Sequence, residues 1–192
     1  MNTKRLVYIA IFTALIIVGG FITVPVPYSP TPLSFQTLFV IMAGLVLGGR
    51  DGAAAVLVYL VMGLFGLPVF TQGGGVGYVF KPSFGYLIGF PIGALVSGVL
   101  CSRIKRMTRG KVFLSALCGM VPIYIIGITY QVLIVYLYLG KTFAAAVAGV
   151  PAILVLAVKD AVLCGLTASV YPSLRRAVRR RPSTKAVKDP IS

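Results

Sequence analysis

Residues 83–101 read SFGYLIGFPIGALVSGVLC, a run of 19 residues without a charged side chain. At 1.5 Å per residue a helix of this length extends about 28 Å, close to the roughly 30 Å hydrocarbon core of a bilayer. Small residues recur at every fourth position of the run, at Gly85, Gly89, Gly93 and Ser97. Residues four apart share one helix face, and a face of small residues lets two helix backbones approach closely. The segment therefore predicts a membrane-spanning helix that packs against another helix of the same protein.

The composition of the whole chain agrees with a membrane protein. Hydrophobic residues make up 58% of the 192 residues, whereas soluble domains are roughly 45–50% apolar. The chain has three acidic residues, Asp51, Asp160 and Asp189, and no histidine. A soluble domain of this length would carry far more charge.

Five further apolar segments predict the remaining helices. They cover 6–24, about 33–47, about 53–65, a stretch within 112–139, and 151 to about 172. A turn is expected over 48–52, an extended loop over the four prolines of 25–32, and a glycine-rich loop over 66–82. We therefore predict an all-α integral membrane protein with six transmembrane helices. It would form a single domain over 1–174, followed by a basic tail over 175–192.

The net charge of +15 has three interpretations: nucleic-acid binding, an anionic substrate, or membrane topology. The basic residues lie between or beyond the apolar segments, not along one stripe as in a nucleic-acid-binding protein. Six helices would place fifteen of the eighteen Lys and Arg residues on one side of the membrane. The positive-inside rule then predicts that both termini are cytoplasmic. Lys81 and Lys141 fall on the other side, and Lys159 falls inside the last helix.

The sequence lacks the motifs of an enzyme. Gly140-Lys141-Thr142 resembles the end of a phosphate-binding loop, but Val135 stands where that loop needs its first glycine. Gly75-Val76-Gly77 lacks the third glycine of a dinucleotide-binding loop. Without histidine, the commonest acid–base and metal-binding side chain is missing as well. We predict a non-enzyme without metal or cofactor, so any ATP would be used by another subunit.

Lys159 and Asp160 are charged residues in an apolar segment. If the last helix begins near Pro151, Asp160 lies about 14 Å along it, half-way through the bilayer core. A charge at that depth costs at least ~2.5–3.5 kcal/mol, so it should face a polar partner or a wet cavity. Neighbouring helix positions point about 100° apart, so we expect the two side chains to pair poorly with each other. A ligand and a structural ion pair remain the alternatives.

Aromatic and amide side chains gather in the half of the protein predicted to face outward. An aromatic belt at the membrane interface accounts for some of them, but an amide against lipid is costly and favours a polar pocket. The candidates are Tyr28, Phe35, Gln36, Gln72, Tyr86, Tyr130 and Gln131. Lys81 is either an interfacial lysine whose amine reaches water or a counter-charge for an anionic ligand.

Two stretches of the chain resemble the BioY family, whose members are the biotin-binding S-components of energy-coupling-factor transporters. The first runs from Pro25-Val26-Pro27 through Ser34-Phe35-Gln36 to Leu47-Gly48. The second runs from Gly66-Leu67-Pro68 through a glycine-rich loop to Phe90. The resemblance covers most of 1–172 and implies a six-helix S-component fold in the bacterial cell membrane. It also implies an outward pocket covered by the loop after the first helix.

The resemblance implies partners as well. Ala10 and Ala14 match the Ala-x-x-x-Ala motif by which the family contacts a transmembrane coupling subunit, and that subunit carries two cytoplasmic ATPases. Asp160 resembles the acidic residue of the family's last helix. Many members have a lysine three residues later, where this chain has Leu163, and Lys159 is the candidate replacement.

Biotin has a ureido ring, an apolar thioether ring and a carboxylate tail. The resemblance therefore implies that Asp160 accepts a hydrogen bond from a ureido N–H, while Lys81 or Lys159 faces the carboxylate. The aromatic residues and the loop with Gly74 and Gly75 would close over the rings. Two alternatives remain: an S-component for another vitamin, since a fold does not fix its ligand, and a structural membrane subunit that binds no small molecule.

Overall fold

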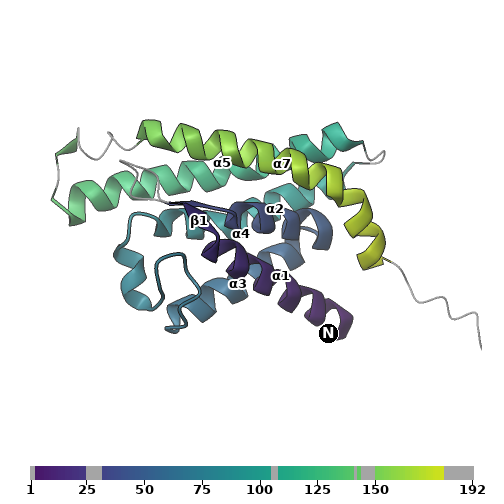
Figure 1. Cartoon of the computed structure of the whole chain (residues 1–192), viewed down its shortest axis with the longest axis horizontal. Helices are drawn as coiled ribbons and strands as arrows, with labels where there is room; N and C mark the ends of the chain where they lie inside the picture. Colours follow the sequence, from purple (N-terminus) through teal and green to yellow (C-terminus); the bar gives the residue numbers. More distant parts are fainter. Residues whose placement is uncertain (1–2, 25–31, 105–107, 141, 144–149, 180–192) are drawn as a thin grey trace, which may run out of the picture.

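The computed structural model describes residues 3–24, 32–104, 108–140, 142–143 and 150–179 (Figure 1). Within these residues the predicted all-α architecture with six helices is confirmed. The helices are α1 (Thr3–Phe21), α2 (Gln36–Leu47), α3 (Gly49–Leu64), α4 (Phe84–Ser102), α5 (Arg109–Leu133) and α7 (Val150–Arg179). Shorter elements are the strands β1 (Thr23–Val24) and β2 (Leu33–Ser34), a 3₁₀ helix η1 (Val76–Phe80) and a π-helix η2 (Ile134–Tyr138) that continues α5.

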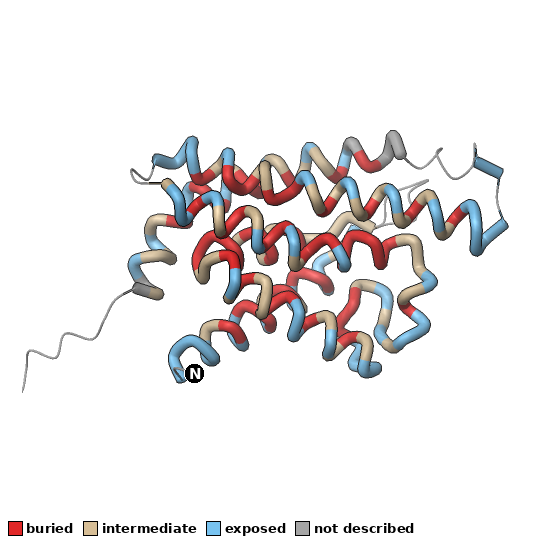
Figure 2. The backbone as a smooth tube through the Cα atoms, turned by 180° about the vertical axis from the view of Figure 1, so that it is seen from behind, coloured by how far each residue is buried: buried red, intermediate tan, exposed pale blue. Residues whose placement is uncertain are grey.

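Four of these helical regions are long and apolar enough to cross a membrane. They are Thr3–Phe21, Phe84–Ser102, Arg109–Tyr138 and Val155–Arg176. The buried positions face the interior of the bundle, and the outer surfaces of α5 and α7 are largely exposed (Figure 2). The exposed side chains are strongly apolar; on α7, Val158 is 66% exposed and Val162 is 68% exposed. An apolar exterior around a packed interior is what a lipid environment favours.

Helix α4, which carries the predicted face of small residues, packs against α2, α3 and α5. A Cβ atom added at Gly89 would lie 2.8 Å from the Ile123 Cα atom, and one at Gly93 would lie 2.7 Å from the Gly119 carbonyl oxygen. On the α2 side, a Cβ at Gly44 would lie 2.2 Å from the Ala94 carbonyl oxygen. These contacts confirm that the small-residue face of α4 packs within the protein.

The turn expected over 48–52 is wrong in its extent, because α3 begins at Gly49. Gly48 alone reverses the chain, with a φ of 93° that favours glycine. Its N–H bonds the Gly44 carbonyl of α2 at 3.0 Å, and its own carbonyl accepts from the Gly52 N–H at 2.9 Å. One residue thus ends α2 and starts α3, so residues 49–52 are helical.

A two-stranded sheet, which the sequence did not predict, closes the base of the proline-rich loop. Strand β1 pairs with β2 in antiparallel register, with Thr23 opposite Ser34 and Val24 opposite Leu33. The helix expected from residue 33 therefore begins only at Gln36. Residues 25–31, which include most of the predicted lid, lie outside the described residues.

The last helix continues beyond its expected end near Pro172. It runs to Arg179, so the first residues of the predicted tail are helical. Proline removes one backbone N–H from the helix ladder, and membrane helices tolerate such a loss. Figure 1 shows the end of α7 and the N-terminus on the same side of the molecule.

Candidate ligand-binding site

A small cavity lies where β2, α2, α4, α5 and α7 meet. It encloses about 40 Å³, and both apolar rings and polar groups line it. The lining residues are Pro32, Ser34, Gln36, Thr37, Thr71, Tyr78, Ser83, Tyr86, Leu87, Phe90, Ile123, Tyr124, Leu156, Lys159 and Asp160. These residues come from seven segments of the chain, so the cavity exists only in the folded bundle.

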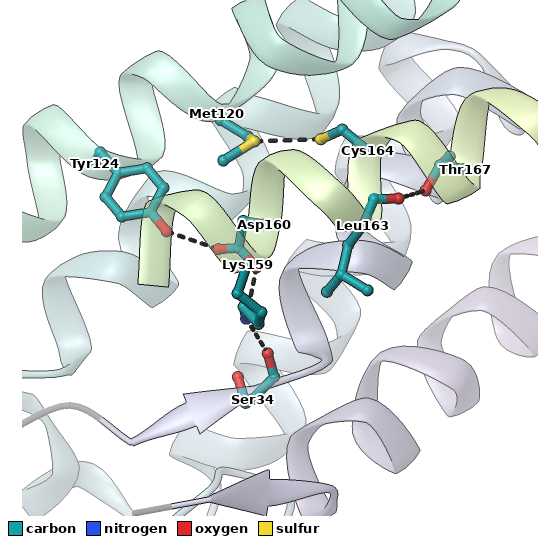
Figure 3. Close-up of polar contacts among 8 residues, drawn as sticks. All are labelled: Ser34, Met120, Tyr124, Lys159, Asp160, Leu163, Cys164 and Thr167. Atoms are coloured by element: carbon teal, nitrogen blue, oxygen red, sulfur yellow. Dashed lines mark hydrogen bonds and ion pairs between the residues drawn. The ribbon is translucent and has the colours of Figure 1, made fainter. Parts of the chain in front are cut away.

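The carboxylate of Asp160 is the most deeply buried charge of this cavity, since the residue is only 4% exposed. The Tyr124 hydroxyl donates to Oδ2 at 2.7 Å, and the Lys159 ammonium lies 2.5 Å from Oδ1 (Figure 3). Thr37 lines the same cavity. A buried carboxylate needs such partners to remain charged.

Lys159 connects α7 to the base of the proline-rich loop. Its ammonium pairs with Asp160 and also donates a hydrogen bond to the Ser34 carbonyl of β2 (Figure 3). The prediction that Lys159 and Asp160 pair poorly is therefore wrong. Their Cβ atoms do point in different directions, but four methylenes let the lysine side chain bend back to its neighbour. The same flexibility lets it reach Ser34.

Four of the predicted ligand-binding residues line this cavity: Gln36, Tyr86, Lys159 and Asp160. Gln36 is 1% exposed, and its amide nitrogen lies 3.5 Å from the Ile16 carbonyl oxygen. Gln36 thereby places α1 behind the cavity wall.

A fifth candidate, Gln131, lies behind the wall and is 1% exposed. The Tyr86 hydroxyl donates to Gln131 Oε1 at 3.4 Å. Gln131 thus helps to hold the Tyr86 ring that faces the cavity, and it does not line the cavity itself.

The other candidates among the described residues lie outside the cavity lining. Lys81 donates to the Gln72 carbonyl at 2.8 Å and lies 4.8 Å from the Tyr78 ring centroid. Lys81 therefore contacts Tyr78, a residue of the cavity lining, without lining the cavity itself. The Tyr130 hydroxyl donates to the Val79 carbonyl at 2.5 Å, which ties α5 to η1.

The candidates Gly74, Gly75 and Phe35 have roles in the backbone structure of their loops. Gly75 adopts a φ of 95°, and its N–H bonds the Gly63 carbonyl at 2.7 Å. A Cβ at Gly74 would lie 2.0 Å from the Leu67 carbonyl oxygen. The Phe35 N–H bonds the Gly19 carbonyl at 3.2 Å. Tyr28 lies outside the described residues.

Sequence reasoning missed the hydroxyl groups of the site. Tyr124 binds Asp160 directly, and Ser34, Thr37 and Ser83 line the same cavity. The available signal was a hydroxyl side chain within an apolar segment, but Ser and Thr in membrane helices often bond only their own backbone. Ser97 does so here, at 3.1 Å from the Ala94 carbonyl. Only the fold distinguishes hydroxyl side chains that line the cavity from those that bond their own helix backbone.

The cavity is chemically suited to binding. Its ion pair offers one acceptor and one donor side by side, surrounded by the rings of Tyr78, Tyr86, Phe90 and Tyr124. Among the described residues, the lining contains no cysteine beside a base and no group of carboxylates. Such a site recognises a small polar group attached to an apolar body.

The face of α1 with Ala10 and Ala14 points away from the bundle. Both residues are exposed, whereas Phe12 and Ile16 on the opposite face are 4% and 0% exposed. This small-residue pair therefore does not serve helix packing within the described bundle.

Comparisons with known proteins point in one direction. The model of the BioY family matches residues 1–180. A biotin transporter BioY from Rhizobium etli is 36% identical over 183 residues, which cover 91% of this chain and 98% of that one. A probable biotin transporter BioY from Lysinibacillus sphaericus is 46% identical over 129 residues, 67% of this chain and 65% of that one. The crystal structure of the S-component for biotin from an ECF-type ABC transporter superimposes with a TM-score of 0.78 at 25% identity, covering 93% of both chains.

Proposed function

This chain belongs to the BioY family, and on that premise we propose that it is the biotin-binding S-component of an ECF-type uptake transporter. Its relatives are named as transporters, which confirms the prediction that the chain is not an enzyme. The proposed role is to capture biotin at the outer face of a bacterial cell membrane. The observation that carries the proposal is the buried Lys159–Asp160 pair in the wall of an aromatic cavity.

A ureido group matches that ion pair in hydrogen-bonding capacity. The ureido ring of biotin presents N–H donors and one carbonyl acceptor, and the pair presents a carboxylate acceptor and an ammonium donor 2.5 Å apart. Asp160 would accept from a ureido N–H, and Lys159 would donate to the ureido oxygen. Charge-assisted hydrogen bonds of this kind are about twice as strong as neutral ones.

The carboxylate tail of biotin would then lie at the other end of the cavity. Lys159 cannot serve both ends of an extended ligand while it touches Asp160. Lys81 lies beside the Tyr78 ring and is the better candidate for the carboxylate. The thioether ring would lie among the aromatic side chains between the two ends.

Ligand entry must enlarge the cavity. Its 40 Å³ is far below the roughly 300 Å³ of a small-molecule site. We propose that biotin displaces the Lys159 ammonium from the Ser34 carbonyl. That exchange would release β2 from α7, so one side chain would couple ligand binding to the attachment of β2.

The proposed orientation and partners rest on two sets of exposed residues. Arg5, Arg50 and Arg103 are exposed and belong to the fifteen basic residues assigned to one side, which would be cytoplasmic under the positive-inside rule. The exposed face of α1 with Ala10 and Ala14 would contact the coupling subunit. That subunit and its two ATPases would supply the energy, so this chain itself would need no nucleotide.

A binding titration tests the ligand. The purified full-length chain in detergent is titrated with biotin, thiamine and riboflavin by calorimetry. We expect saturable binding of biotin alone. Binding of thiamine or riboflavin in place of biotin would favour the S-component for another vitamin. Binding of none of the three would favour a structural subunit.

A second experiment tests the partner surface separately. Ala10→Leu/Ala14→Leu should abolish co-purification with the coupling subunit and leave biotin affinity unchanged. Val162→Phe, at an exposed position of α7, is the control that adds bulk to another outer face. Loss of co-purification in both variants, or in neither, would contradict the role assigned to α1.

A further inference from the structure

A second and larger cavity of about 520 Å³ lies between the first turn of α5 and the last turns of α7. The residues that line it are Thr108, Arg109, Val112, Ala168, Tyr171, Pro172, Arg175 and Arg176. Arg175 follows Asp160 by fifteen residues, so this cavity lies about 22 Å further along α7 than the first one. None of its lining residues belongs to the proposed biotin site.

Three arginines surround this cavity without a carboxylate from the described part of the chain. The ion pairs among the described residues join Arg5 to Asp51 and Lys159 to Asp160, and neither pair involves a residue of this cavity. The whole sequence has only three acidic residues against eighteen basic ones, so basic side chains are in large excess. The Arg175 guanidinium lies 5.7 Å from the Tyr171 ring centroid, a cation–π contact that holds the charge beside the cavity.

The floor and the surroundings of the cavity are apolar. Val112, Ala168 and Tyr171 form its inner wall and are 2–4% exposed. Two residues closer to the bundle centre, and on the outer sides of the same helices, Leu114 is 60% exposed and Leu166 is 54% exposed. A cationic rim therefore adjoins an apolar helix surface, and the boundary falls where α5 and α7 leave their apolar segments.

We propose that this cavity binds an anionic phospholipid. The phosphate would contact Arg109, Arg175 and Arg176, and an acyl chain would lie along the exposed apolar surface of α5 and α7. A free phosphate would use the rim and leave the apolar wall uncovered. A phospholipid matches both halves of the site, and basic pockets between membrane helices are typical sites for anionic headgroups.

Native mass spectrometry of the full-length chain in detergent tests this inference. Phosphatidylglycerol and phosphatidylcholine with identical acyl chains are added in equal amounts, and the lipid retained per protein is measured against concentration. We expect retention of phosphatidylglycerol at concentrations where phosphatidylcholine is lost. Each arginine near a phosphate contributes roughly fivefold in affinity. The triple variant Arg109→Gln/Arg175→Gln/Arg176→Gln should therefore lower the affinity for phosphatidylglycerol about a hundredfold.

Matched variants separate this site from general charge and from misfolding. Arg50→Gln removes an exposed arginine elsewhere and should leave lipid retention unchanged. The triple variant should still bind biotin like the wild type, which shows that it is folded. Equal retention of the two lipids, or undiminished retention by the triple variant, would overturn the proposal. Full competition by glycerol 3-phosphate would overturn the lipid part, because that anion lacks acyl chains.

Discussion

The two cavities along α7 differ in whether their charged side chains have partners within the protein. The first cavity, with Lys159 and Asp160, lies within the bundle and is called the inner cavity below. There the Asp160 carboxylate contacts Lys159 and Tyr124, and the lysine also contacts Ser34. In the cavity near the end of the helix, three arginines meet no carboxylate from the described residues. One site satisfies its own charges, and the other leaves them for something outside the protein.

The contrast follows from the cost of an unpaired charge at each place. Within the bundle the surroundings are apolar, so an uncompensated ion is expensive and the chain must provide its partner. At the helix ends water and lipid headgroups are available, so the chain can keep an excess of one sign. A ligand of the cavity with the ion pair must therefore replace partners that already exist, whereas a ligand of the arginine cavity adds the first one.

The largest expected effect comes from removing the buried carboxylate. Asp160→Asn leaves Lys159 as an unpaired charge in the bundle, which should destabilise the protein by roughly 3–5 kcal/mol. It also removes the proposed acceptor for biotin, so affinity should fall about 10- to 100-fold. Thermal unfolding in detergent and calorimetric titration measure the two effects. Unchanged biotin affinity would remove Asp160 from the binding site.

A double variant separates the two effects. Lys159→Met/Asp160→Asn removes both charges and keeps the approximate shape of the side chains, so most of the stability should return. Biotin affinity should not return, because neither the acceptor nor the donor is restored. If affinity recovered together with stability, the ion pair would have a purely structural role.

The next effect concerns packing near each cavity. Gly89→Ala places a Cβ atom 2.8 Å from the Cα atom of Ile123, which lines the inner cavity. Overpacking of this kind costs roughly 1–3 kcal/mol. Gly110→Ala near the other cavity meets nothing within 4 Å, so it should be neutral or slightly stabilising, since alanine favours a helix. Equal melting temperatures of the two variants would contradict the close packing of α4 on α5.

The fold could be predicted from the sequence where one residue type dominates a segment. Uninterrupted apolar runs revealed six helices, and glycines at every fourth position revealed the packed face of α4. One missed feature depends on partners distant in sequence, and another depends on how few residues a turn requires. Strand β2 exists because Leu33 and Ser34 pair with residues before the loop, and α3 starts early because one glycine suffices for the turn.

The candidate site was predictable only in part for the same reason. Asp160 and Gln36 are conspicuous because a charge or an amide is costly in an apolar segment. Tyr124 is an ordinary residue of an apolar helix until α5 and α7 pack together and bring its hydroxyl to Asp160. Lys81 looked like a free cation, but the fold gives it the Gln72 carbonyl.

A smaller effect is expected beside the inner cavity. Lys81→Ala should lower the affinity for biotin by roughly fivefold, which is the magnitude expected for a partly exposed charge pair. An uncharged biotin amide should bind the wild type and the variant about equally, because it has no carboxylate for the lysine to meet. Lys81→Arg, which keeps the charge, is the control. Equal losses for biotin and its amide would assign Lys81 to the loop and not to the ligand.

The smallest effect is expected for the ion pair that joins the start of α1 to α3. The Arg5 guanidinium donates from Nε to both Asp51 oxygens, at 2.8 and 2.7 Å, a geometry as favourable as that around Asp160. Both side chains reach solvent, however, at 49% and 23% exposure, and water can replace each partner. Arg5→Gln should therefore leave the melting temperature and biotin affinity unchanged, and added salt should not alter that result. A loss of stability comparable to that of Asp160→Asn would show that pairing geometry, not burial, decides how much a charge pair matters in this protein.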